Sequence, residues 1–347
     1  MSSKRNVLFI TVLLLIVLQS GCIDNPATTE PPEPFVSEFQ LIWDMFNSQY
    51  VGFVLRDVNW DSVYNQYYEL ADNVSSREEM TELTVNLLAG LTDYHVRLID
   101  PTGSSIFTYS PEIQQNYDMD VLMSYLEPYG FQWMQEGSWG YCLVGADSIP
   151  YFVISVWSSD FNTSLFGNVL QPLLDKPGLI IDIRMNSGGL EGPVNNVTRM
   201  FVDQLRTGYL FQERISSDNH ELDNPIEYLM YPRGWYFSNP VVLLTGETNT
   251  GASEIFVCEM AELPNVTTMG ATTMGAANCP ATAWELPDNY YVLCPTRTIL
   301  RPDSAVIEGV GLPPDVLVEA TEADFAQGID PILESAFEYL GSPLFRH

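Results

Sequence analysis

The fold of this chain is decided by one stretch, Pro240-Val-Val-Leu-Leu-Thr245-Gly-Glu-Thr-Asn-Thr-Gly251-Ala-Ser-Glu254-Ile-Phe-Val-Cys-Glu-Met260. An apolar run with the length of a buried strand comes first, a polar turn follows, and an apolar helix begins near Gly251. A strand, a tight turn and a helix N-terminus present one side chain and several free backbone amides at a single point. The stretch therefore predicts an α/β core with a functional turn before its helix.

Strand-like and helix-like segments alternate along the chain after His95. We expect strands at 152–156, 179–184 and 240–245, helices near 193–205 and 253–263, and a closing helix over 322–340. This alternation is typical of a layered α/β domain, which we place at residues 93–347.

Residues 35–92 predict a helical subdomain ahead of that core. Two apolar faces repeat at helical spacing, in the sets Phe39, Ile42, Trp43, Phe46, Tyr50 and Met80, Leu83, Leu87, Leu88, Leu91. Ser76 and Glu79 have the spacing of a capping box at the start of the second helix.

The charge balance is strongly acidic. The 347 residues include 14 Lys and Arg against 45 Asp and Glu, a formal net charge of −31. Such acidity argues against binding to nucleic acid or to anionic lipid. It favours a solvated acidic surface, and cationic partners or a high-salt habitat stay open as alternatives.

The N-terminus predicts export and lipid anchoring. Lys4 and Arg5 precede an apolar run from Val7 to Leu18, and Leu18-Gln-Ser-Gly-Cys22 has the form of a lipoprotein cleavage site. We expect a signal peptide at 1–21, lipidation of Cys22 and a Pro-rich tether at 22–34. The domain would then face outward from the membrane of the cell envelope.

Four further cysteines could form disulfides in an exported protein, and Cys279 with Cys294 is the pairing we favour over the others. Buried free thiols remain an equal alternative for these cysteines. No spacing of Cys and His resembles a zinc site, and we expect neither a metal nor a cofactor.

Five motifs in order resemble those of the S41 family of serine peptidases, which includes the C-terminal (tail-specific) processing peptidases. The motifs are Leu91-Thr-Asp-Tyr-His95, Asp182-Ile-Arg184-Met-Asn186-Ser-Gly188-Gly189, Gly251-Ala-Ser-Glu254, Met269-Gly270-Ala-Thr-Thr273-Met-Gly275 and Ile307-Glu308-Gly-Val-Gly311-Leu-Pro-Pro-Asp315. The resemblance implies a ClpP/crotonase-like α/β core and peptide or protein substrates. The segment between His95 and the 179–184 strand is too short for a PDZ domain, so the chain resembles a PDZ-less member.

The resemblance also implies an oxyanion site and a histidine base. The backbone amides of Gly188, Gly189 and Ala252 would stabilise the oxyanion. Family members with a Ser/Lys dyad carry the lysine at a position that is Ala276 here, so His95 matches the tricorn-like branch instead. The candidate acids that would orient His95 are Glu308 and Glu262.

The nucleophile position departs from the family. Where the family usually reads Ser-Ala-x-Glu, this chain reads Gly251-Ala-Ser-Glu254, and glycine offers no hydroxyl. Ser253 could serve only if the turn is shifted, because two residues along a helix rotate a side chain by roughly 200°. Two hypotheses follow: a His-based serine peptidase, or a peptide-binding protein that has lost catalysis.

Overall fold

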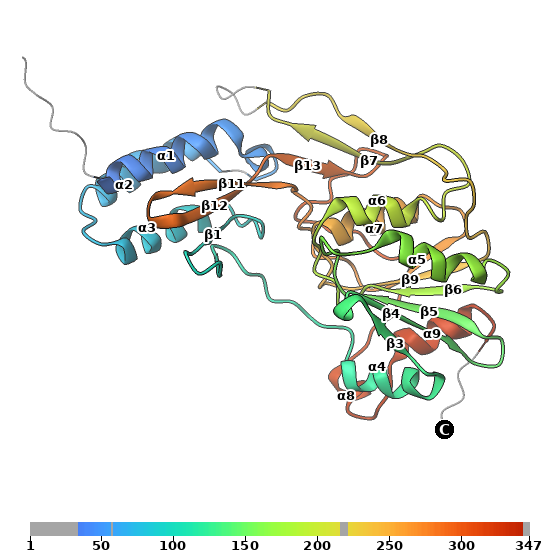
Figure 1. Ribbon diagram of the computed structural model, residues 1–347. Coiled ribbons are helices and arrows are strands. Elements are labelled where there is room, and N and C mark those ends of the chain that lie inside the picture. The colour runs from blue at the N-terminus through green and yellow to red at the C-terminus, as the bar shows by residue number, and fades with distance from the viewer. Residues whose placement is uncertain (1–33, 57, 216–220, 343–347) are drawn as a thin grey trace, which may run out of the picture.

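The computed structural model describes residues 34–56, 58–215 and 221–342, which form a large α/β lobe and a smaller lobe beside it (Figure 1). The predicted signal peptide, Cys22 and the tether lie outside the described residues. The large lobe is built on a seven-stranded sheet with the order β14-β10-β9-β6-β5-β4-β3. Its strands are β3 (Gln132–Met134), β4 (Trp139–Val144), β5 (Ile149–Ile154), β6 (Leu179–Asp182), β9 (Val241–Thr245), β10 (Val266–Gly270) and β14 (Val316–Leu317).

Helices cover both faces of this sheet because its central strands are apolar on both sides. The side chains of Leu179 and Ile181 pack with α5 (Thr163–Leu170), α6 (Glu191–Thr198) and α7 (Ala252–Ala261). Ile180 faces the other way, toward α4 (Met119–Leu126) and α9 (Pro331–Tyr339). Alternate residues of a strand point to opposite faces, so a continuous apolar run needs two helical layers. The predicted layered α/β class is confirmed.

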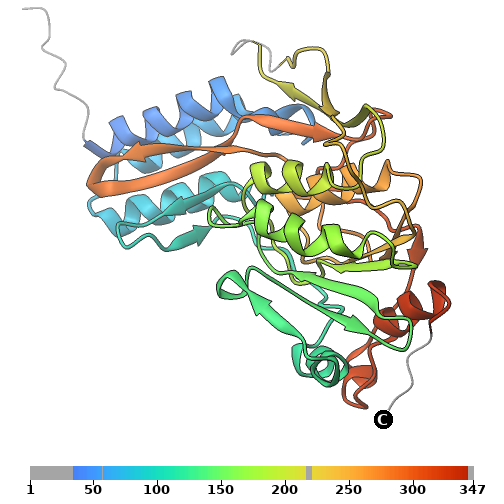
Figure 2. The same cartoon turned by 45° about the vertical axis from the view of Figure 1, so that its right-hand side comes forward.

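The smaller lobe combines the N-terminal helices with a second sheet. Helices α1 (Pro34–Gln49), α2 (Trp60–Ala71) and α3 (Arg77–Ala89) pack against the strand order β11-β12-β1-β2 (Figure 2). These strands are β1 (Arg97–Ile99), β2 (Ser105–Phe107), β11 (Ala281–Leu286) and β12 (Tyr290–Pro295). Val96 and Val292 belong to the same buried cluster as the helices. The lobe therefore does not end at residue 92, because later strands complete its core.

A third sheet, with the order β13-β7-β8, lies beside α7 and near the smaller lobe (Figure 1). Its strands are β7 (Arg206–Glu213), β8 (Ile226–Met230) and β13 (Arg297–Leu300). The segment between β2 and β6 adds β3, β4 and β5 to the main sheet, which agrees with the absence of a separate inserted domain there.

Two predicted helices differ from those observed. The helix predicted near 193–205 is α6, which ends at Thr198. The closing helix predicted over 322–340 is two helices, α8 (Glu322–Phe325) and α9. Gly328, with a φ of +71°, and Pro331, at the start of α9, separate them. The predicted Cys279–Cys294 disulfide is not formed, because both residues are free thiols.

Candidate active site

The turn predicted between a strand and a helix joins β9 to α7, and Gly251 occupies its tip. Gly251 is the N-cap of α7, with a φ of +52° and a ψ of −117°. Its N–H donates to the carbonyl of Ala276 at 2.8 Å, which fixes the turn against the following loop. A positive φ of this kind is strained for residues with a side chain, and it projects the Cβ position out of the strand-to-helix turn.

His95 faces that tip from the other lobe. It lies in the turn between α3 and β1, where its backbone N–H donates to Oδ1 of Asp93 at 2.9 Å. A Cβ atom added to Gly251 would lie 3.1 Å from Nε2 of His95. Burial lowers the pKa of His95, the more so because of Arg97 and Arg56, while Asp93 opposes that shift. The imidazole is therefore neutral at pH 7, as a general base requires.

Ser253, the alternative nucleophile, does not share this position. It lies in the first turn of α7, its side chain is fully buried, and its Oγ has no hydrogen-bond partner among the described residues. It is also missing from the walls of the cavity that His95, Gly251 and Ala252 line. The structure thus gives no support to a turn shifted by two residues, because Gly251 and not Ser253 faces the imidazole.

Of the three residues whose backbone amides we predicted at this site, two line the cavity beside Gly251. The N–H of Gly188 donates to Oδ1 of Asn186 at 2.9 Å and so shapes the turn instead of facing the cavity. Gly189 and Ala252 both line the cavity. The Ala252 N–H is the first of α7, and the N–H groups of a helix's first turn have no intrahelical acceptor. The geometry can therefore accept a substrate carbonyl or a developing oxyanion.

Neither candidate acid contacts the imidazole of His95. The carboxylate of Glu308 accepts the N–H groups of Ala277 and Asn278 at 2.7 and 2.8 Å and forms an ion pair with Arg56. Burial, with a smaller contribution from the neighbouring Asp93, raises the pKa of Glu308 to about 8, although Arg56 opposes the shift. Nδ1 of His95 is buried and has no partner in the described part of the chain. Glu308 therefore stabilises the loop at 277–278 and links it to Arg56, and it does not orient His95.

Glu262 is exposed at the opposite end of α7 from Gly251. Ten helical residues at 1.5 Å each separate the two ends by about 15 Å. Glu262 is therefore too far from the turn to orient His95, and this part of the prediction is wrong.

Glu254 is a structural residue of the turn whose importance the sequence did not reveal. Its buried carboxylate accepts the hydroxyl of Thr273 at 2.5 Å and the N–H groups of Gly275 and Ala276 at 2.7 and 2.8 Å. Burial raises the pKa of Glu254 to about 7, against the lowering effect of these donors. The Thr273 hydroxyl also accepts the N–H of Leu312 at 2.8 Å, so Thr273 supports the geometry of the loop.

The Asp182-Ile-Arg184 part of the second motif is also structural. The guanidinium of Arg184 is fully buried and pairs with Asp182 at 2.7 Å and with Asp330 at 2.8 Å. This triad joins the end of β6 to the N-cap of α9, because Asp330 also accepts the N–H of Leu333 at 3.0 Å. The triad therefore anchors the end of β6, after which the Asn186 turn follows in the chain.

The site cavity has a volume of about 700 Å³ and lies where the two lobes meet. One wall comes from β1, β2 and β12, and the other from the Gly189 turn, α6 and α7. Its lining residues from the motifs are Tyr94, His95, Ser187, Gly189, Gly251 and Ala252, with Arg97, Glu191 and Cys279 beside them.

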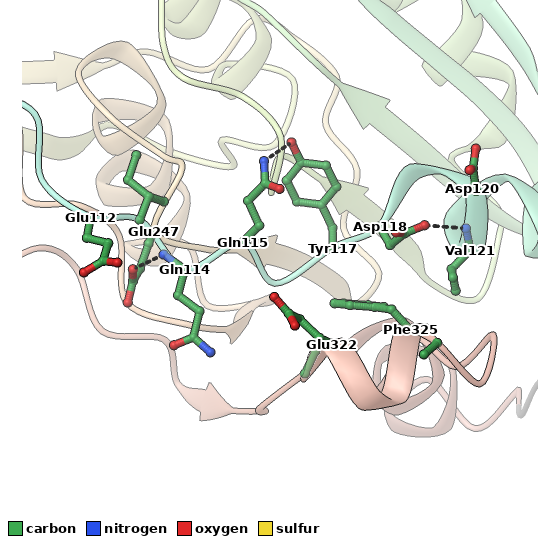
Figure 3. A pocket seen from close by; sticks show the side chains of 13 residues that line it. Glu112, Gln114, Gln115, Tyr117, Asp118, Asp120, Val121, Glu247, Glu322 and Phe325 are labelled. Carbon is green, nitrogen blue, oxygen red and sulfur yellow. Dashed lines mark hydrogen bonds between the residues drawn. The ribbon is translucent and has the colours of Figure 1, made fainter.

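A second cavity, of about 1150 Å³, is larger but shares no lining residue with the first (Figure 3). Its carboxylates are Glu112, Asp118, Asp120, Glu247 and Glu322. Two of them are engaged locally, because Glu247 accepts the N–H of Gln114 at 2.8 Å and Asp118 accepts that of Val121 at 2.9 Å. Within the described residues no group of three or more His, Cys, Asp and Glu is arranged to hold a metal ion.

The described residues contain no helix with the length and apolar character that a bilayer crossing requires. The predicted lipid anchor at Cys22 lies outside them.

Comparisons with known proteins agree with this geometry, which defines an α/β peptidase-like site at a strand-to-helix turn. Residues 149–318 match the model of peptidase family S41, and residues 31–89 match the tricorn protease C1 domain. The chain belongs to peptidase family S41. Both the motif order and the two matches support this assignment.

Individual relatives are distant and longer. The tricorn protease of Thermoplasma volcanium is 26% identical over 171 residues, which are 49% of this chain and 15% of the relative. The carboxy-terminal-processing protease of Bartonella bacilliformis is 23% identical over 156 residues, 45% of this chain and 34% of the relative. The chain thus spans about a third or less of these curated relatives.

Solved structures support the fold over most of the chain. A Parabacteroides merdae protein, provisionally assigned as a peptidase, superposes with a TM-score of 0.78 at 24% identity. The match covers 89% of this chain and 97% of that one. A lipoprotein of Streptococcus agalactiae superposes with a TM-score of 0.61 at 14% identity, covering 92% and 100% of the two chains.

Proposed function

We propose that this protein binds extended peptides in the cavity between its lobes and does not cleave them through an acyl-enzyme. The main support for this proposal is the position of Gly251 at the tip of the turn before α7. It holds the position at which a side chain would meet Nε2 of His95, and it has no hydroxyl to offer. Covalent catalysis needs a nucleophile within reach of its base.

Other hydroxyl and thiol groups near the turn are poorly suited to replace it. The Oγ of Ser253 is buried away from the cavity, and the hydroxyl of Thr250 donates to the carbonyl of Ser187 at 2.7 Å. Burial raises the pKa of the Cys279 thiol to about 12, so this group is protonated at neutral pH.

Peptide binding is supported by main-chain groups that survive without the nucleophile. Gly189 and Ala252 line the cavity, and a backbone N–H at such a position suits a peptide carbonyl. Strand β2 is an edge of its sheet and lines the same cavity through Ser105 and Phe107. An extended peptide can add to such an edge, gaining affinity from main-chain pairing and specificity from side-chain pockets.

The protein is further proposed to act at the cell envelope, held by a lipid on Cys22. The basic start, the apolar run and the small residues before Cys22 support this. Expression of the full chain, followed by membrane fractionation and mass analysis of the N-terminal peptide, tests it. Loss of the lipid mass and of membrane association in Cys22→Ala is expected, and unchanged membrane association would count against the anchor.

The test of peptide binding combines affinity with product analysis. Pools of fluorescein-labelled peptides are titrated by anisotropy and then recovered for mass spectrometry after prolonged incubation with the protein. We expect saturable binding and intact peptides. Cleavage that survives in Gly251→Ala but disappears in Ser253→Ala would instead establish a peptidase with a shifted nucleophile.

A further inference from the structure

An arginine forms part of the cavity wall beside His95. Arg97 lies on β1 directly opposite Phe107 on β2 and Leu293 on β12, and all three residues line the cavity. Residues paired across neighbouring strands point to the same face of a sheet. One row of the smaller lobe's sheet therefore presents a cation to the cavity, between an aromatic and an aliphatic side chain.

Among the described residues, Arg97 differs from most other arginines in having no counter-ion. Six arginines contact a carboxylate, namely Arg56, Arg77, Arg184, Arg206, Arg297 and Arg301. In the described residues Arg97 has no such contact, and its buried Nε lacks a hydrogen-bond acceptor. Its guanidinium lies 5.5 Å from the centre of the Phe107 ring. This is an unusual state in a chain with a net charge of −31, where acidic partners are abundant.

The nearby acid Glu191 does not supply the missing charge. It lines the same cavity, but its carboxylate pairs with Arg297 at 2.9 Å and accepts the hydroxyl of Tyr209. Burial also lowers the pKa of Arg97, which reflects a guanidinium held partly out of water. Arginine nevertheless stays protonated at neutral pH.

We infer that Arg97 binds a carboxylate of the ligand and makes the cavity selective for peptides that carry one near the bound main chain. A guanidinium accepts a carboxylate through parallel N–H donors, and Nε is one of the donors in that arrangement. The cation–π contact with Phe107 keeps the guanidinium beside that ring. The carboxylate has two chemical sources, a peptide C-terminus or an acidic side chain. This inference rests on the proposed peptide-binding function.

The experiment uses the full-length protein and three pools of fluorescein-labelled hexapeptides with randomised residues. The first pool ends in a free carboxylate, the second in a carboxamide, and the third in a carboxamide with glutamate fixed at the third position. Anisotropy titrations compare the wild type with Arg97→Gln. The matched control is Arg233→Gln, because Arg233 also lies over an aromatic ring, Trp235, but outside the cavity.

The wild type and Arg233→Gln are expected to bind one carboxylate pool about tenfold more tightly than the carboxamide pool, the effect of one charge-assisted contact. Arg97→Gln is expected to abolish that difference while the carboxamide affinity stays the same. Preference for the first pool identifies a C-terminus, and preference for the third an acidic side chain. Equal binding of all three pools by the wild type overturns the role of Arg97 and leaves peptide binding intact. Absence of any binding overturns both proposals.

Discussion

A Cβ atom at Gly251 would lie 3.1 Å from Nε2 of His95, although the two residues come from different lobes and are far apart in the sequence. This distance is slightly short for a Cβ contact, and a small movement of the imidazole would relieve it. It is short enough that a hydroxyl on that Cβ would be within reach of the base. The site therefore keeps the candidate base His95, the turn before α7 and the amides of Gly189 and Ala252, although the nucleophile position is a glycine.

Replacing Ser253 by alanine is expected to leave the protein as stable as the wild type, or more stable by up to about 1 kcal/mol. The reason is that the Ser253 hydroxyl is buried without a partner in the described structure, and burying an unsatisfied polar group is unfavourable. Urea unfolding measures the effect. Thr250→Ala is the control, because its hydroxyl bonds the Ser187 carbonyl at 2.7 Å and its loss should cost about 1 kcal/mol or more. A marked loss of peptide affinity in Ser253→Ala would contradict the assignment.

Replacing Asp330 by alanine is expected to lower the free energy of unfolding by about 3–5 kcal/mol, since it leaves the buried Arg184 guanidinium short of one carboxylate. The matched control is Asp118→Ala. Asp118 is likewise an N-cap, accepting the Val121 N–H at 2.9 Å, but no arginine pairs with it in the described residues. Its loss should cost about 1 kcal/mol. Equal losses in the two variants, measured by denaturant titration, would refute the support role of the triad.

Glu259 predicts a dependence of stability on pH. Burial, with a smaller contribution from the nearby Glu191, raises its pKa to about 8. The folded state therefore keeps a proton that the unfolded chain loses near pH 4.5. The stabilisation is complete below that pH and is lost as the pH rises through about 8, with a slope on the order of 1.4 kcal/mol per pH unit.

Glu259→Gln should remove this part of the slope. Unfolding free energies at several pH values between 5 and 8.5 are compared for the wild type and the variant. The difference between the two curves should change steadily with pH, whatever constant offset the amide introduces. Parallel curves would show that Glu259 is ionised in the folded state over that range.

The fold was largely predictable because its signals are local. The apolar runs that become β6 and β9, and the turn that places Gly251 at the start of α7, follow from residue order and burial. Helix ends were less predictable, since the break between α8 and α9 depends on Gly328 and Pro331.

The roles of individual site residues depend on contacts between distant segments. Glu308 pairs with Arg56, which is 252 residues away in the sequence, and no spacing rule connects them. The N–H of Gly188 donates to Oδ1 of Asn186 and not to the cavity. Which of the two adjacent glycines offers its amide to the cavity depends on the turn geometry, which the sequence does not reveal. Glu262 was a candidate acid because of its spacing from Gly251 in the sequence. It lies at the C-terminal end of α7, however, and the length of that helix separates it from His95.

The most direct test of the central claim is intact-protein mass analysis after treatment with a fluorophosphonate probe. It compares the wild type with Gly251→Ser, with Gly251→Ala as the control for added bulk at a positive φ, and with the double variant Gly251→Ser/His95→Ala. Thermal unfolding first establishes that each variant is folded.

We expect no adduct on the wild type or on Gly251→Ala, one adduct at residue 251 in Gly251→Ser, and loss of that adduct when His95 is also replaced. An adduct at Ser253 in the wild type would contradict it, as would a folded Gly251→Ser protein that remains unlabelled.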